Sequence, residues 1–220
     1  MQLTEDQSTD YLRADPQFFE RNAHLLTEIY LPSPHGSGTV SLAERQQLAQ
    51  RDKIRVLEVK LAELLQFGEE NDAIGDKVHR LCLAMLGSPS FDILMRLVVE
   101  HLREDFKVPH VAIRLWAKPL NKEDAASEEF GALSEELRIW AQGLASPYCG
   151  HHPGPDLSDL FGAANAPLKS YAFVALRGEE VFGLLAMASE DEQRFYPEMG
   201  TVYLKRIGEL LSAALLRYIQ

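Results

Sequence analysis

The residues with the clearest chemical potential lie close together at Cys149, His151 and His152. A thiolate and two imidazoles can supply three of the four ligands of a tetrahedral zinc ion, and Asp156 or Asp159 could supply the fourth. Adjacent histidines rarely face the same ion, so we expect an ordered loop without a metal or another cofactor. In that loop Cys149 is a small buried group, and either histidine can form a hydrogen-bonding wall of a ligand pocket.

Cys149 could alternatively be the nucleophile of a redox enzyme. The sulfenic acid formed at such a cysteine must be discharged by a second thiol. The other cysteine, Cys82, lies on the apolar face of an expected helix, where it is better explained as core filler. The sequence has no glycine-rich phosphate loop and no nucleophile elbow, and the acidic pairs at 128–129 and 135–136 are expected on a solvated surface. We therefore expect a protein that is not an enzyme.

The charge balance excludes several classes of partner. The chain has 220 residues, of which 33 are acidic and 22 basic, so its formal net charge is −11. Non-specific binding of nucleic acid depends on lysine and arginine, so this balance argues against it. No apolar run approaches the roughly 20 residues that cross a bilayer, and the first residues lack the pattern of a secretory signal. We expect a cytoplasmic protein with neither a nucleic-acid nor a membrane partner.

The chain is expected to have three regions, which cover residues 1–38, 39–87 and 88–220. The first should contain short helices, one of them with Asp15 as its N-cap and Pro16 as its first residue. The prolines and glycines at 31–38 predict a linker. In the second region, Ser41 and Glu44 form a capping box that predicts a long helix over about 42–67. Glycines at positions 68 and 75 should interrupt it before another helix follows.

The long helix carries a short apolar seam with the 3-4 spacing of a heptad repeat, formed by Ile54, Leu57, Leu61 and Leu64. Gln47 and Gln50 occupy the preceding seam positions, so the seam is about two heptads long. Such a helix could lie on its own domain or pair with a second copy. Two dozen helical residues extend roughly 40 Å, which is longer than a domain of this size covers. We therefore expect a homodimer formed through the helices.

The third region alternates helical and strand patterns. Helices are expected at about 91–106, 135–144 and 157–161 and at the C-terminus, and strands at about 109–116, 171–176 and 181–188. The last two strands are separated by a four-residue turn, which predicts an antiparallel hairpin. Residues 117–133 should form a polar surface loop, and residues 146–155 should be irregular. The predicted fold class is α+β: an antiparallel sheet with helices packed on one face, preceded by a helical N-terminal region with a long helix.

Two resemblances make this prediction more specific. The stretches 170–176 and 182–189, followed by Phe195 and an amphipathic helix, resemble the closing half of a GAF domain. A resemblance to the bacterial family catalogued as domain of unknown function, family 484, spans nearly the whole chain. The segments that carry it are Tyr11-Leu12, Asp15-Pro16-Gln17-Phe18-Phe19, Val40 to Gln46, Tyr148-Cys149-Gly150 and Arg194 to Thr201. That family is described as GAF-like with a helical N-terminal region.

The resemblance implies a non-enzymatic sensory or regulatory module. GAF domains bind small molecules and dimerise in signalling proteins, and their ligand usually lies between the sheet and the long connection, here residues 117–169. The candidate ligand-binding residues are Arg114, Trp116, Tyr148, Cys149, His151, His152, Phe161 and Phe173. Arg114 could hold an anion and the aromatic residues could stack on a flat ring. The rival interpretation is an interaction scaffold whose pocket is filled by its own side chains.

The signal would have to reach a separate protein partner. The N-terminal segment offers the candidate surface for that partner, because its apolar residues precede a linker. These residues are Phe18, Phe19, Leu25 and Leu26.

Overall fold

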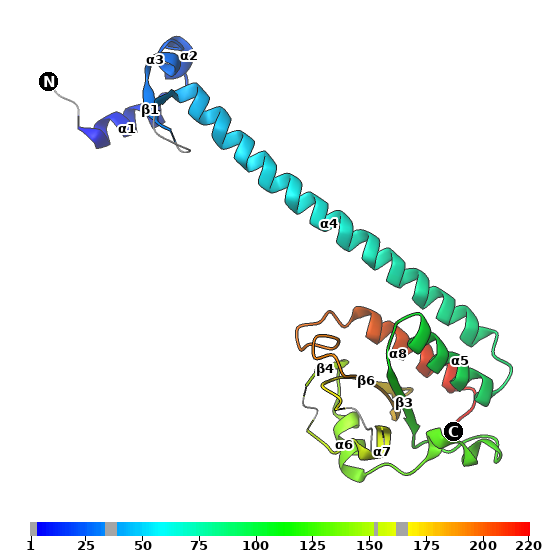
Figure 1. Ribbon diagram of the computed structural model, residues 1–220. Helices are drawn as coiled ribbons and strands as arrows, with labels where there is room; N and C mark the ends of the chain where they lie inside the picture. Colours follow the sequence, from blue (N-terminus) through cyan, green and yellow to red (C-terminus); the bar gives the residue numbers. More distant parts are fainter. Residues whose placement is uncertain (1–3, 34–38, 152–153, 162–166) are drawn as a thin grey trace. The chain divides into compact units, whose positions relative to one another are not determined.

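The computed structural model describes residues 4–33, 39–151, 154–161 and 167–220 (Figure 1). The chain divides into two compact units, residues 1–69 and residues 70–220. They are called here the N-terminal unit and the C-terminal unit, and helix α4 (Leu42–Leu86) contributes to both. No helix in the described part of the chain is long and apolar enough to span a membrane.

The N-terminal unit combines short helices with a small hairpin. Its elements before α4 are α1 (Glu5–Ala14), α2 (Phe18–Arg21), α3 (Leu25–Glu28), β1 (Tyr30–Pro32) and β2 (Thr39–Ser41). The two strands are antiparallel, with Leu31 opposite Val40. The short helices were predicted, but the hairpin was not. It includes part of the segment predicted as a linker, whose residues 34–38 lie outside the described residues.

The predicted helix start at Asp15 and Pro16 is wrong. Asp15 is the C-cap of α1, and its carboxylate accepts a hydrogen bond from Arg21 instead of capping a helix. Helix α2 begins after Gln17, whose side chain makes no capping hydrogen bond. The acidic side chain is therefore used in an ion pair around the turn between α1 and α2.

Helix α4 begins at the predicted capping box and continues without interruption to Leu86. The Ser41 amide donates to Glu44 Oε2 over 2.9 Å, and the Glu44 amide donates to Ser41 Oγ over 3.2 Å. The predicted interruptions at Gly68 and Gly75 are wrong. Each glycine weakens a helix interior by only about 1 kcal/mol relative to alanine, and neither has another atom within 4 Å of its Cβ position. A helix of 45 residues retains its continuity despite two such positions.

The C-terminal unit is built on a four-stranded antiparallel sheet with the order β3-β6-β5-β4. The strands are β3 (His110–Leu115), β4 (Tyr148–Gly150), β5 (Ser170–Arg177) and β6 (Val181–Ser189). The hairpin β5–β6 was predicted, whereas β4 lies in the stretch predicted as irregular. Phe173 in the middle of β5 is opposite Ala186 of β6 and Tyr148 of β4.

The helices of this unit fall close to their predicted positions. They are α5 (Phe91–Glu104), α6 (Glu135–Gln142), α7 (Ser158–Phe161) and α8 (Val202–Leu215). The connection predicted as a polar loop contains two 3-10 turns, η1 (Asp124–Ala126) and η2 (Glu128–Phe130).

Two apolar cores lie on opposite faces of the sheet. The larger core joins the sheet to the end of α4 and to α5 and α8, which lie on one side of it (Figure 1). It includes Leu81, Leu94, Val98, Leu185, Met187 and Leu211. The smaller core joins the other face to α6 and α7 through Leu137, Ala141, Leu160, Phe173, Leu184 and Ala186. The predicted α+β class is confirmed, but helices cover both faces of the sheet, not one.

Candidate functional site

The sheet face under α6 and α7, called here the aromatic face, carries most of the predicted ligand-binding residues. Alternation along β3 directs Arg114 and Trp116 to this side, and pairing of β4 with β5 places Tyr148 beside Phe173. Phe161 at the end of α7 reaches the same cluster through Tyr171, with ring centroids 6.5 Å apart. The structure therefore brings these five predicted residues to one face.

Phe173 is the centre of this cluster and is fully buried. Its ring lies 5.2 Å from that of Trp140 in a perpendicular arrangement, 6.2 Å from the stacked ring of Tyr171 and 6.1 Å from Tyr148. Edge-to-face and offset contacts of this kind stabilise aromatic clusters. The space around Phe173, where a ligand was predicted, is occupied by the protein's own rings.

Trp140 and Tyr171 were absent from the prediction, although the sequence holds a signal for both. Trp140 follows Leu137 at helical spacing on α6, and Tyr171 is two residues before Phe173 on a strand, which places both on the same side. Side chains two residues apart on a strand lie on the same face, so the prediction of Phe173 as a site residue should have included Tyr171.

Arg114 is buried and already has protein partners. Its Nη1 donates to the Ile113 carbonyl over 3.0 Å, and its Nη2 donates to Glu128 Oε1 over 3.1 Å. Of the acidic pair predicted on a solvated surface, Glu128 is exposed although it pairs with Arg114, whereas Glu129 is half-buried. Burial is the main cause that raises the pKa of Glu129 above its ordinary value. Trp116 donates from Nε1 to the Val181 carbonyl over 2.8 Å, which ties β3 to the start of β6.

Cys149 does not join the other predicted residues. In β4 it lies between Tyr148 and Gly150, so its side chain faces the larger core on the opposite side of the sheet. Burial raises the pKa of its thiol to about 11. His151 places Nδ1 3.1 Å from the Lys169 carbonyl, and His152 lies outside the described residues. No group of three or more metal-binding side chains occurs among the residues that the structure describes.

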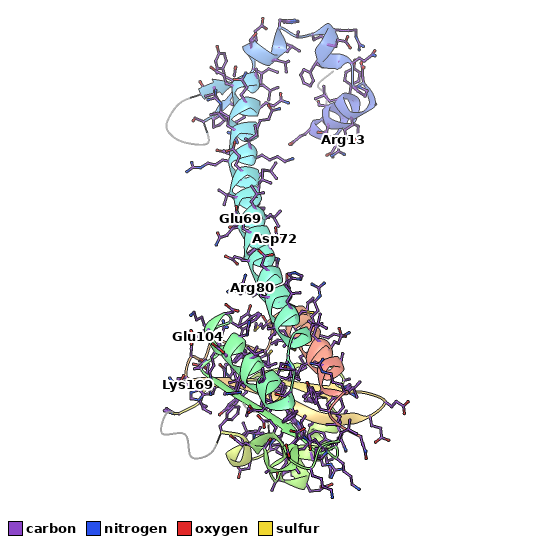
Figure 2. All side chains as sticks on the ribbon, turned by 90° about the vertical axis from the view of Figure 1, so that its right-hand side faces the viewer. Arg13, Glu69, Asp72, Arg80, Glu104 and Lys169 are labelled. Carbon is purple, nitrogen blue, oxygen red and sulfur yellow. The ribbon has the colours of Figure 1, made fainter. Side chains whose placement is uncertain are left out.

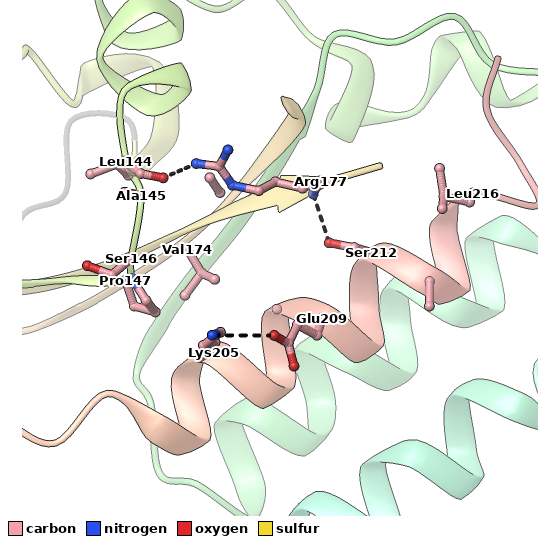
Figure 3. Close-up of a pocket in the computed structure, with 13 residues that line it drawn as sticks. Leu144, Ala145, Ser146, Pro147, Val174, Arg177, Lys205, Glu209, Ser212 and Leu216 are labelled. Carbon is pink, nitrogen blue, oxygen red and sulfur yellow. Dashed lines mark hydrogen bonds and ion pairs between the residues drawn. The ribbon is translucent and has the colours of Figure 1, made fainter. Parts of the chain in front are cut away.

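A cavity of about 250 Å³ lies at another place, between β5, α8 and the segment before β4 (Figure 3). Its wall is mainly apolar and includes Leu144, Pro147, Val174, Ala175, Ala213 and Leu216. Its polar residues are Ser146, Arg177, Lys205, Glu209 and Ser212. Of the predicted ligand-binding residues that the structure describes, none lines this cavity.

The cavity exists because the short strand β4 pairs with only part of β5. Pairing stops at Phe173 opposite Tyr148, and Pro147 cannot donate a backbone hydrogen bond to extend it. The Arg177 amide instead donates to Ser212 Oγ of α8 over 3.0 Å, and the Arg177 guanidinium donates to the Leu144 carbonyl. Figure 3 shows these contacts bridging the cavity from β5 to both of its walls.

On α8, Lys205 Nζ lies 3.9 Å from Glu209 Oε1 at the cavity. Both side chains are largely exposed, so water screens this ion pair and it holds the two groups only weakly. Lys205 is therefore available to an acidic ligand at small energetic cost.

The chain belongs to the family described as protein of unknown function, DUF484, whose model matches residues 1–220. It is 29% identical over 216 residues to the uncharacterized protein YigA of Salmonella typhimurium, an alignment that covers 96% of this chain and 90% of that protein. The protein YigA of Escherichia coli K12 is 30% identical over the same length and with the same coverage. Among solved structures, the GAF domain from Acinetobacter phosphoenolpyruvate-protein phosphotransferase gives a TM-score of 0.42 at 14% identity, covering 64% of this chain and 92% of that one.

Proposed function

We propose that this protein is a non-enzymatic, GAF-like regulatory module of the cytoplasm that acts as a homodimer. Its C-terminal unit binds a small organic acid in the cavity between β5 and α8, and α4 joins the two copies. The state of the cavity is passed on to a separate protein partner. The predicted partner surface of Phe18, Phe19, Leu25 and Leu26 is only partly exposed. More exposed apolar residues of the N-terminal unit, such as Tyr30 at 63% exposure, add to this surface.

The observation that carries this proposal is that α8 contacts both the cavity and the end of α4. Lys205, Glu209 and Ser212 of α8 line the cavity. From the same helix Tyr203 Oη donates to the Asn71 carbonyl of α4 over 2.8 Å. Just beyond α8, Arg217 Nη2 donates to the Met85 carbonyl over 2.9 Å. A ligand that displaces α8 would therefore weaken two hydrogen bonds to α4.

The chemistry of the cavity favours a small acid with an apolar body. Val174, Ala175 and Pro147 offer an apolar wall, while Lys205 and Arg177 supply positive charge. A cationic group can hold a carboxylate by a charge-assisted hydrogen bond. The volume of about 250 Å³ is below the usual range for small-molecule sites, so it suits only a molecule of few heavy atoms.

The position of Cys149 supports the non-enzymatic part of the proposal. A cysteine nucleophile needs an accessible thiolate, but Cys149 is buried and its thiol pKa is raised to about 11. A redox mechanism at this residue would require it to turn to the other face of the sheet.

A second candidate function is an interaction scaffold without a ligand. The packing of Phe173 against Trp140 and Tyr148 favours it, because these rings fill the space that the resemblance assigned to a ligand. The two candidates differ in what the cavity beside α8 does.

The test uses the full chain with Ala213→Trp, which fills the cavity, and Val202→Trp as a matched control at an exposed position of α8 outside it. Each protein is titrated with a panel of short aliphatic and aromatic carboxylates while thermal unfolding is followed, and its mass in solution is measured by light scattering. A carboxylate that stabilises the natural and Val202→Trp proteins but not Ala213→Trp supports the regulatory function. A dimer that no panel member stabilises favours the scaffold, and a monomer at high micromolar concentration overturns both.

A further inference from the structure

A long run of exposed apolar side chains lies along α4, mainly in the N-terminal unit. Every residue from Arg51 to Ala73 is exposed, and the large apolar side chains in this stretch are 54–65% accessible to solvent. They are Ile54, Val56, Leu57, Val59, Leu61, Leu64, Leu65 and Phe67. Exposed apolar patches of this extent mark interaction surfaces.

The rest of the N-terminal unit offers little core of its own. None of the residues of α1, α2 or α3 is buried, and the described residues of the two apolar cores begin at Val78. Because most helix stability in proteins comes from packing of an apolar face, this stretch of α4 needs a partner.

The spacing identifies that partner as another helix with the same repeat. With Ile54 and Leu61 as positions a, Leu57 and Leu64 are positions d, and a β-branched residue at a with leucine at d favours two strands. The seam then meets Gly68, and Glu69 and Asp72 project from the helix just beyond it (Figure 2). Val78 and Met85 continue the same repeat but are buried in the larger core of the C-terminal unit. The free seam is therefore confined to about two heptads.

The charged residues beside the seam favour one orientation of the partner helix, parallel or antiparallel. In this repeat Lys53 is at position g and Glu58 is at the following position e. In a parallel pair in register, each g side chain faces the next e side chain of the other helix. Lys53 would then lie beside Glu58 of the second copy. Because the dimer has two-fold symmetry, it contains this attractive pair twice.

An antiparallel pair centred on the same seam would do the opposite. Position g would face g and position e would face e. Lys60 would then lie beside Lys60 of the second copy, and Glu58 beside Glu58 of the second copy. Like charges at these positions disfavour that arrangement. The apolar seam is compatible with both parallel and antiparallel pairing, so the charged residues determine which is favoured.

We propose that residues 54–64 of α4 bind the same residues of a second copy as a parallel, in-register coiled coil in which Lys53 pairs with Glu58 of the partner. The proposal rests on the homodimer put forward under Proposed function and adds its direction and register. Both N-terminal units then lie at the same end of the coiled coil.

Cysteine cross-linking of the full chain tests the direction. In a Cys82→Ser background, Leu64→Cys should form a disulfide-linked dimer under mild oxidation, because identical d positions face each other in a parallel pair. Val59→Cys, at the outer f position, should link much less. A mixture of Ile54→Cys and Leu64→Cys chains that links residue 54 to residue 64, shown by peptide mapping, would indicate antiparallel pairing and overturn the proposal.

Charge reversal tests the register. Lys53→Glu or Glu58→Lys alone should weaken the dimer roughly tenfold, since two attractive pairs become repulsive, and the double variant should recover most of the affinity. An antiparallel dimer would show no such recovery. If the natural chain stays monomeric at the highest concentrations used, the homodimer itself fails, whereas a dimer with the wrong cross-links contradicts only its direction.

Discussion

Gly208 of α8 lies directly against Val174 of β5: a Cβ atom placed on the glycine would come 2.3 Å from the valine Cγ1. Real Cβ atoms do not approach a neighbour so closely, so the absence of a side chain at residue 208 sets how near the helix can come to the strand. Both residues also line the cavity between β5 and α8. The spacing that packs the larger core therefore also fixes one wall of the proposed ligand site.

Replacing Gly208 by alanine should destabilise the C-terminal unit. The added methyl group must push α8 away from β5 or force Val174 out of its rotamer, and overpacking of this kind lowers the free energy of unfolding by about 1–3 kcal/mol. Urea unfolding followed by circular dichroism measures the effect. Gly200→Ala is the matched control, because no atom lies within 4 Å of the Cβ position of residue 200. Equal stability of the two variants would mean that α8 and β5 are less closely packed than described.

Replacing a glycine inside α4 by alanine should instead raise the free energy of unfolding. Gly75→Ala adds a methyl group where nothing lies within 4 Å, and alanine is favoured over glycine in a helix interior by about 1 kcal/mol. We expect a free energy of unfolding that rises by up to this amount, with unchanged cavity binding. A lower stability would indicate that the helix bends at residue 75 or that another segment packs closely against it, in conflict with a continuous α4.

The sequence predicted α5, β5 and β6 well because each has a strong apolar signal. Helix α5 repeats its apolar residues at helical spacing, and β5 and β6 are apolar runs separated by a short turn. Strand β4 has only Tyr148 to Gly150, too few residues to show alternation, and its partner β5 lies more than 20 residues further along the chain. The β1–β2 hairpin escaped prediction because each of its strands also has only three residues.

The missed strand also explains why the predicted site was only partly right. A loop would have allowed Tyr148 and Cys149 to point into one pocket, but a strand sends consecutive side chains to opposite faces. The alternative cavity is formed by Leu144, Arg177 and Lys205, which come from three separate segments. Their proximity depends on the tertiary packing of α8, which no local pattern specifies.

Cys149 should react slowly with thiol reagents in the folded protein. Its thiol is buried and its pKa is raised to about 11, so little thiolate exists at pH 8, whereas Cys82 is partly exposed. In a Cys82→Ser variant we expect almost no reaction with a chromogenic disulfide until urea unfolds the chain. Since folding keeps this proton bound, the stability it contributes should be lost as the pH rises from about 9 through 11. Rapid labelling of the folded variant at pH 8 would instead support a reactive, redox-active Cys149.

Glu129→Gln should stabilise the protein at neutral pH. Burial raises the pKa of Glu129 from its ordinary value of 4.5, the charge of Glu128 and that of Asp92 act in the same direction, and a backbone hydrogen bond and Arg114 oppose them. A group whose pKa is raised on folding contributes stability below its unfolded pKa and loses it as the pH rises through the folded value. The ionised carboxylate thus destabilises the folded state at pH 7, and a neutral amide of the same shape removes that effect.

Urea unfolding at several pH values measures the difference between the natural protein and this variant. The gain should be largest near pH 7 and should disappear below about pH 4, where Glu129 is protonated in both states. Glu128→Gln is the matched control: the Glu128 side chain is 83% exposed, so water screens its ion pair with Arg114 and the substitution should change stability little. An equal gain in both variants would show that loss of negative charge near Arg114, and not burial of Glu129, causes the effect.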